Sequence, residues 1–206
     1  MRSKPNSPPL EAQHDHRGQE LHPRRKPLTM LLCDTEISLS GIIEPFEEGQ
    51  VRKAGTSYGL SSYGYDVRLG REFVTIKPTG WALSPDTISE ADVMRTEADT
   101  FVLHPGAFVL AVTAEYLRMP ADVTGLVCDK SSWARCGLSV QNTVLEAGWH
   151  GEVTLELHNQ SPRPLLLTAG QGIAQVLFVK GMPCATTYAD RAGRYQGQRG
   201  VTLPRR

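Results

Sequence analysis

The segment DKSSWARCGL, which begins at Asp129, places two hydroxyls and two cations close together. If Asp129 caps a short helix, Lys130, Ser131 and Ser132 occupy its first turn, where backbone N–H groups lack acceptors and attract anions. Arg135 would share a helix face with Ser131, and a guanidinium can grip phosphate oxygens through two parallel hydrogen bonds. The segment is therefore typical of a phosphate site, although a capped surface turn with an exposed Lys130 and Arg135 has the same pattern.

Carboxylates follow downstream in the stretch TVLEAGWHGEVTLELHN. Its alternation predicts a strand with Glu152, Thr154, Glu156 and His158 on one face. If that face lines a pocket, Glu156 with a raised pKa could act as a general base near neutral pH. The alternative is a solvent-exposed polar face, as in any half-buried antiparallel strand. Glu146 precedes Ala-Gly-Trp, where a turn would expose it. It could bind a sugar hydroxyl, act as a second acid or be solvated.

The composition restricts the partners of the protein. The 206-residue chain has 22 basic and 22 acidic residues, so its formal net charge is zero. No global field then favours nucleic acid or an anionic membrane, and any anion site must be local. The absence of a long apolar run and of a signal-peptide core predicts no membrane span and a cytoplasmic location. The cysteines form no CxxC pair, and we expect reduced thiols with Cys128 and Cys136 buried as small hydrophobes.

The chain divides into a polar extension and one domain. Residues 1–29 are rich in Pro, Arg, His and Gln, which predicts a disordered extension; a start codon assigned too early would explain it equally well. Residues 30–206 are expected to fold as a single domain. Its polar, glycine-rich and basic end, from about residue 186, is expected to be a flexible arm outside the core.

Short alternating segments dominate residues 30–180. We expect a short helix and turn in residues 30–49, one or two helical turns closed by Gly137, and a loop over residues 84–100. SSYGYDVRLG, REFVTIKP, VTGLVCD, GLSVQNTV, GEVTLELHN, RPLLLTAG and QGIAQVLFV are expected to be strands, as are the two halves of FVLHPGAFVLAVTAEYLRMP. Regularly spaced short strands with Gly and Pro turns indicate a β-barrel or sandwich.

Four ordered motifs together resemble the dCTP deaminases of the dUTPase-like superfamily. They are DKSSWARCGL, TVLEAGWHGEVTLELHN, GIAQVLF and RYQGQRGVTLPR, and SSYGYDVRLG resembles the family's N-terminal strand motif. The resemblance runs from about Met30 to the C-terminus. It implies a mainly β fold, a distorted β-barrel with one or two short helices and a flexible C-terminal lid. It also implies a homotrimer with active sites between subunits, dCTP as substrate and dTTP as inhibitor.

The resemblance also implies roles for individual residues. Lys130, Ser131 and Ser132 would contact phosphates bridged by Mg²⁺, Ser131 and Arg135 would reach the base and its attacking water, and Glu156 would be the catalytic glutamate. Asn142, Thr143, Glu146 and Trp149 would contact base and sugar, and Tyr188, Arg194, Tyr195 and Gln198 would contact the nucleotide from the lid. Lys130 stands where Arg is usual, so a point charge would replace a bidentate fork there. Glu146 occupies a position where relatives commonly have Asp, and the loop over residues 137–148 is shorter than in some relatives.

The implied chemistry is hydrolytic deamination of dCTP to dUTP and ammonia, in the supply of pyrimidine deoxynucleotides. Zinc deaminases carry an H-x-E and P-C-x-x-C signature, which this sequence lacks, so we expect no zinc and no metal held by protein side chains. Glu156 would then move a proton from water to N3 of cytosine. The alternatives are a dUTPase, which has no need of Glu156, a bifunctional deaminase and dUTPase, and a non-catalytic nucleotide-binding trimer.

Overall fold

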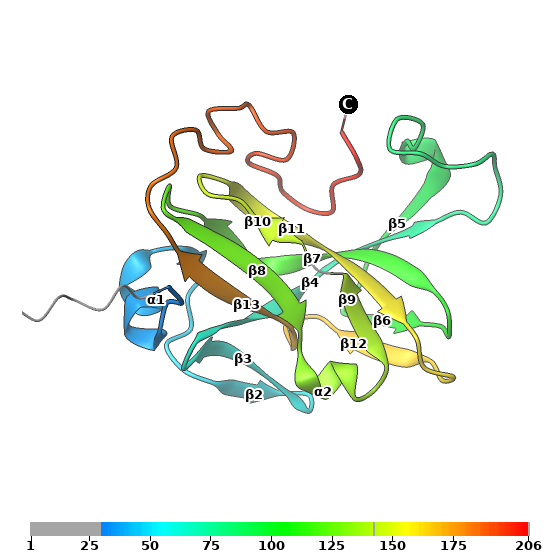
Figure 1. Ribbon diagram of the computed structural model, residues 1–206. Helices are drawn as coiled ribbons and strands as arrows, with labels where there is room; N and C mark the ends of the chain where they lie inside the picture. Colours follow the sequence, from blue (N-terminus) through cyan, green and yellow to red (C-terminus); the bar gives the residue numbers. More distant parts are fainter. Residues whose placement is uncertain (1–29, 142, 206) are drawn as a thin grey trace, which may run out of the picture.

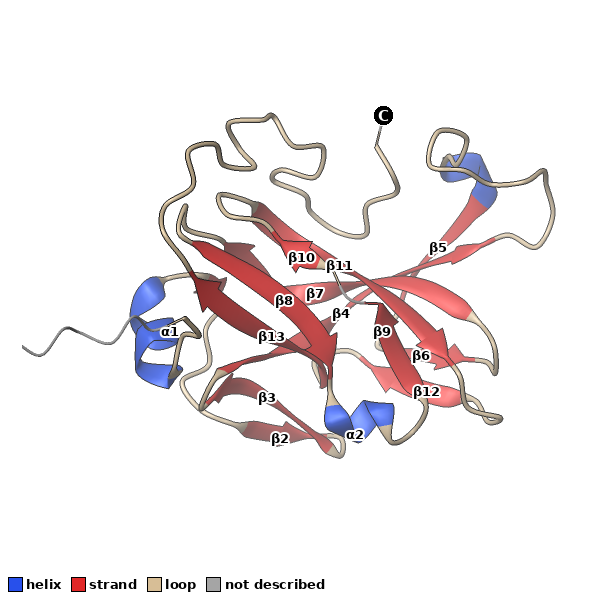
Figure 2. Ribbon diagram, in the orientation of Figure 1, coloured by secondary structure: helices blue, strands red, loops and turns tan. Residues whose placement is uncertain are grey.

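The computed structural model describes residues 30–141 and 143–205, so the expected extension over residues 1–29 lies outside the described residues. Strands dominate the fold, and the helices are short (Figure 2). The helices are α1 (Asp34–Ser40), η1 (Glu90–Asp92) and α2 (Ser131–Ala134). The strands are β1 (Ile43–Glu44), β2 (Val51–Lys53), β3 (Thr56–Ser61), β4 (Gly64–Ile76), β5 (Val93–Glu97), β6 (Thr100–Leu103), β7 (Phe108–Arg118), β8 (Val123–Asp129), β9 (Leu138–Gln141), β10 (Val144–Leu145), β11 (His150–Asn159), β12 (Leu165–Thr168) and β13 (Gly172–Lys180).

The main sheet curls on itself. Its strands follow the order β10-β8-β13-β4-β7-β11-β9, and every pairing is antiparallel. Only residues 142 and 143 separate β9 from β10, so the two ends of this path must lie close together. The N–H of Val127 in β8 also donates to the carbonyl of Thr143, at 3.2 Å. This curled sheet agrees with the predicted distorted barrel (Figure 1).

The core lies inside the curl. Tyr65, Phe73 and Phe178 are fully buried there with the aliphatic faces of β4, β7, β11 and β13. On β11 the buried and half-buried positions alternate along the whole strand, as the sequence predicted. The polar face of β11 is therefore held at a fixed register by the apolar face behind it.

The helix α2 is fastened to the sheet by two side chains. The Trp133 indole donates to the carbonyl of Gly172 at 3.0 Å, and the buried Lys130 ammonium lies 2.6 Å from Asp66. The N-cap of this helix is Lys130 and not Asp129, whose carboxylate accepts from the N–H of Val140 at 2.6 Å. Gly137 closes the turn as predicted, with a φ of 88°.

Three other expectations were wrong. Residues 84–100 contain η1 and β5, because β4 runs through both of its predicted segments and pairs its second half with β5. Cys136 is exposed in the turn after α2, and Cys128 is half-buried because it lies on the less buried face of β8. The C-terminal arm is not outside the core, since Val201 and Leu203 are buried in a second apolar cluster with residues of β4, β5 and β7.

Candidate active site

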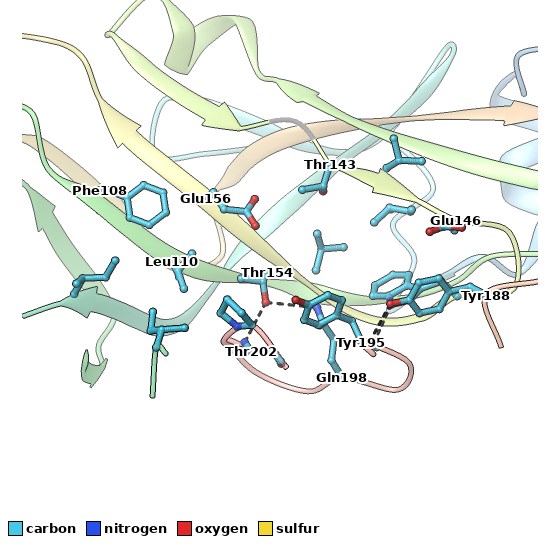
Figure 3. Close-up of a pocket in the computed structure, with 17 residues that line it drawn as sticks. Phe108, Leu110, Thr143, Glu146, Thr154, Glu156, Tyr188, Tyr195, Gln198 and Thr202 are labelled. Carbon is cyan, nitrogen blue, oxygen red and sulfur yellow. Dashed lines mark hydrogen bonds between the residues drawn. The ribbon is translucent and has the colours of Figure 1, made fainter. Parts of the chain in front are cut away.

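A pocket of about 550 Å³ opens between β10, β11 and the C-terminal arm. Glu156 is on its wall, with Phe108 and Leu110 of β7 beside it and Thr143 opposite (Figure 3). The ladder explains this placement, because Glu156 pairs with Leu110 on one side and with Gln141 of β9 on the other. The carboxylate therefore enters the pocket where the two ends of the curled sheet meet.

The surroundings of Glu156 favour its neutral form. Burial beside apolar side chains raises the pKa of Glu156 from 4.5 to about 7. Among the described residues, its buried Oε2 atom has no hydrogen-bond partner. A carboxyl group with one uncommitted oxygen and a pKa near neutrality can accept a proton and return it. These are the properties that a general base needs.

The far end of the pocket is polar and touches the C-terminal arm. Glu146 and Tyr188 lie there, away from Glu156 (Figure 3). The guanidinium of Arg191 pairs with Glu146 and lies 5.8 Å from the centre of the Tyr188 ring. A second pocket of about 460 Å³ adjoins this end and is also lined by Glu146, Tyr188 and Arg191.

The arm covers the pocket through backbone contacts. The Trp149 indole donates to the carbonyl of Tyr195 at 2.9 Å, and the Tyr188 hydroxyl accepts from the N–H of Tyr195 at 3.0 Å. Gly148 permits this approach, because its φ is +79° and an added Cβ would lie 2.5 Å from Thr187. The arm is thus part of the pocket wall.

The SSWAR segment does not line this pocket. Ser131 and Arg135 are exposed and Ser132 is half-buried on α2, which lies at the opposite end of the barrel from the arm (Figure 1). Lys130 is committed to Asp66 and also lies 3.3 Å from the Ser57 hydroxyl. The structure therefore places the predicted hydroxyls and guanidinium on a different surface of the chain from Glu156.

The other predicted residues fall into two groups. The pocket brings together Thr143, Glu146, Trp149, Glu156, Tyr188, Tyr195 and Gln198. Arg194 is exposed and does not line the pocket; its guanidinium donates to the carbonyl of Arg205 at 3.1 Å. Asn142 lies outside the described residues.

Sequence reasoning missed part of the wall. Phe108 and Leu110 line the pocket because they lie across the ladder from Glu156, and only a knowledge of strand pairing could have found them. Thr202 and Pro204 line it because the arm docks there. Arg191 gave no signal beyond its position in a basic arm.

Two negative observations concern the described residues only. No group of three or more His, Cys, Asp and Glu side chains in residues 30–141 and 143–205 could hold a metal ion. Within the same ranges, no helix has the length and apolar character needed to cross a bilayer.

The fold and the site define a curled antiparallel β-barrel with a carboxylate-bearing pocket under a C-terminal arm. A sequence profile described as dCTP deaminase-like matches residues 33–181. The chain is a member of the dCTP deaminase-like family. The arm lies beyond the matched residues.

Similar proteins support this assignment. The dCTP deaminase of Paramagnetospirillum magneticum is 48% identical over 167 residues, which cover 80% of this chain and 91% of that protein. The dCTP deaminase of Acidobacterium capsulatum is 44% identical over 172 residues, 82% of this chain and 94% of that protein. The solved 2'-deoxycytidine 5'-triphosphate deaminase from Agrobacterium tumefaciens has a TM-score of 0.55 at 20% identity, and the match covers 74% of this chain and 48% of that one. That structure supports the fold alone.

Proposed function

We propose that this protein catalyses the hydrolytic deamination of dCTP, supplied as its Mg²⁺ complex, to dUTP and ammonia. The relatives named dCTP deaminase are similar to this chain over most of its length. The observation that carries the proposal is Glu156, a half-buried carboxyl with a pKa near 7 and an uncommitted oxygen in a pocket. The product would feed pyrimidine deoxynucleotide synthesis, and we propose a cytoplasmic location.

The ionised Glu156 carboxylate takes a proton from water, and the resulting hydroxide adds to C4 of cytosine. The protonated carboxyl then returns that proton to N3. The proton of the new C4 hydroxyl passes to the amino group, the C4–N4 bond breaks, ammonia leaves and the C4 carbonyl of uracil forms. Proton transfer of this kind contributes about 10²–10⁴-fold to a rate. The rest must come from positioning and from groups that stabilise the charge developing on the base and the water.

Those groups are proposed to come from a neighbouring subunit. Ser131 and Arg135 are exposed on α2, and Arg135 has no ion pair within the described part of the chain. In a homotrimer, the α2 segment of one chain would face the pocket of the next and complete the site. Ser131 and Ser132 would then bind the phosphates, with Mg²⁺ held by phosphate oxygens and water.

We propose a structural role for Lys130, beside the phosphate contact that the family resemblance implies. Its ammonium is buried against Asp66 within its own chain, so we propose that it fixes the turn that presents Ser131 and Ser132. Thr143, Trp149, Tyr188 and Tyr195 would enclose base and sugar. A second nucleotide such as dTTP would compete with dCTP for the same phosphate-binding residues and act as an inhibitor.

Product analysis tests the proposal against its alternatives. The protein is incubated with dCTP and Mg²⁺, and ammonia, dUTP, dUMP and pyrophosphate are quantified. Equal amounts of ammonia and dUTP support a deaminase. The appearance of dUMP and pyrophosphate with ammonia indicates a bifunctional enzyme, in which Glu146 in the same pocket would orient the second water. No turnover of dCTP overturns the proposal.

A further inference from the structure

We propose that Glu72 and Glu152, assisted by Thr154, form a latch that ties the far end of the C-terminal arm to its own chain. The arm then acts as a strap across the pocket. The latch residues are positioning residues, because they hold in place the arm residues that line the pocket. The latch itself does not depend on the proposed function. Only its effect on dCTP turnover rests on that function.

Three consecutive backbone amides of the arm donate to side chains of the barrel. Gly200 donates to a Glu152 carboxylate oxygen at 2.7 Å, Val201 to a Glu72 oxygen at 3.0 Å, and Thr202 to the Thr154 hydroxyl at 3.1 Å. The carboxylates are partly buried, with side-chain exposures of 29% for Glu72 and 22% for Glu152. Partly buried hydrogen bonds to charged acceptors are stronger than those between neutral groups.

Further contacts hold the same residues from the other side. Arg95 donates to the carbonyl of Val201 at 2.9 Å and pairs with Glu72, so both backbone groups of Val201 are satisfied. Arg199 pairs with Glu152 at 2.8 Å. The Val201 side chain is itself buried with residues of β4, β5 and β7. The latch therefore combines hydrogen bonds with apolar burial at one point of the arm.

The barrel is shaped to receive this segment. Gln198 accepts from the N–H of Glu152 at 3.1 Å and donates its amide to the carbonyl of Glu152 at 2.6 Å. Gly151 lies directly beneath, where an added Cβ would be 2.9 Å from the Gln198 side chain. Gln198 thus belongs to the latch as much as to the pocket.

The latch sits next to the reacting carboxylate. Thr154 is two residues from Glu156 on the same face of β11, and Thr202 and Gln198 line the same pocket (Figure 3). Residues 181–197 run from the end of β13 at Lys180 to the latch, and Tyr188, Tyr195 and Gly197 are also hydrogen-bonded to the barrel along the way. Fixing the far end adds to the hydrogen bond from the Trp149 indole to the carbonyl of Tyr195 and raises the population of the closed form.

Hydrogen exchange on the full-length protein tests the latch without any nucleotide. In the wild type, the amides of Gly200, Val201 and Thr202 exchange slowly. In a Glu72→Ala/Glu152→Ala variant, the exchange of the Gly200 and Val201 amides rises by roughly tenfold or more, as expected for lost hydrogen bonds to charged groups. Glu97→Ala is the matched control, because Glu97 lies opposite Glu72 in the ladder and its exposed side chain pairs with the exposed Arg71.

Steady-state kinetics with Mg²⁺–dCTP provides the second readout. Loss of the latch raises KM by roughly tenfold with kcat nearly unchanged, because only the population of the closed form falls. Glu72→Gln/Glu152→Gln keeps a carbonyl acceptor at each position, so it recovers part of the amide protection and of the low KM. The Gln variant also serves if the Ala variant does not fold.

Exchange at residues 200 and 201 that stays at the wild-type rate in the Ala variant overturns the latch. If the Ala variant does not fold, the same result in the Gln variant overturns it, because an amide oxygen is a weaker acceptor than a carboxylate. So does a fall in kcat at constant KM in an enzyme that turns over dCTP. If the amides lose protection but dCTP is never a substrate, the latch stands and the proposed function fails.

Discussion

The raised pKa of Glu156 predicts that the wild-type residue destabilises the folded protein at neutral and alkaline pH. Burial moves the pKa from 4.5 to about 7, so between these values the unfolded chain loses this proton while the folded chain retains it. Stability linked to Glu156 is therefore fully present below pH 4.5 and is lost as the pH rises through 7. The Glu156→Gln variant, which stays neutral, does not lose it.

The shift sets the size of the effect. One pKa unit corresponds to about 1.4 kcal/mol, which gives roughly 3 kcal/mol for the whole shift and roughly 2 kcal/mol after allowance for partial solvent screening. The Glu156→Gln variant should thus match the wild type near pH 4.5 and exceed its free energy of unfolding by roughly 2 kcal/mol near pH 8.

Urea denaturation at a series of pH values measures this difference, with the protein concentration held constant because an oligomer unfolds in a concentration-dependent way. Glu97→Gln is the control, since it removes a carboxylate whose side chain is 76% exposed. A difference between the Glu156→Gln variant and the wild type that stays constant from acid to alkaline pH would refute the reasoning about burial.

Three further predictions concern activity and assembly. The kcat/KM for dCTP should rise with pH up to about 7 and then level off, because the ionised form of Glu156 takes the proton from water; a steady-state profile that is flat through this range contradicts it. Neither Glu156→Gln nor Arg135→Ala should turn over dCTP alone, yet trimers reassembled from an equal mixture should recover about one quarter of wild-type activity, because each site needs one chain of each kind; mixtures without ammonia release would show that the site lies within one chain. Lys130→Met should lower the free energy of unfolding by roughly 3–5 kcal/mol by leaving Asp66 buried and unpaired, and adding Asp66→Leu should recover most of it in the same urea titration; an equally unstable double variant would count against the role given to this pair.

Local patterns predicted the strands and the residue facing the pocket. The alternation of β11 assigned Glu156 to the polar face, and the position of Gly137 marked the end of α2. These features depend on periodicity and on backbone conformation, which neighbouring residues determine. The ordered set of motifs indicated the family before any fold was known.

Non-local contacts were beyond the reach of the sequence. The neighbours of Glu156 across the ladder, Leu110 and Phe108, are set by strand order, and the capture of Val201 depends on Glu72 far away in the chain. The buried pair of Lys130 and Asp66 also joins distant segments, so no local pattern indicated it. The arm looked flexible because its apolar residues are few, although two of them are buried.

The central claim is that Glu156 transfers the proton in dCTP hydrolysis. The most direct measurement compares the wild type with Glu156→Gln, both for dCTP binding by calorimetry and for dUTP formation in a single turnover. We expect similar affinities and no detectable dUTP from the variant. A variant that binds dCTP and forms dUTP at the wild-type rate would contradict it.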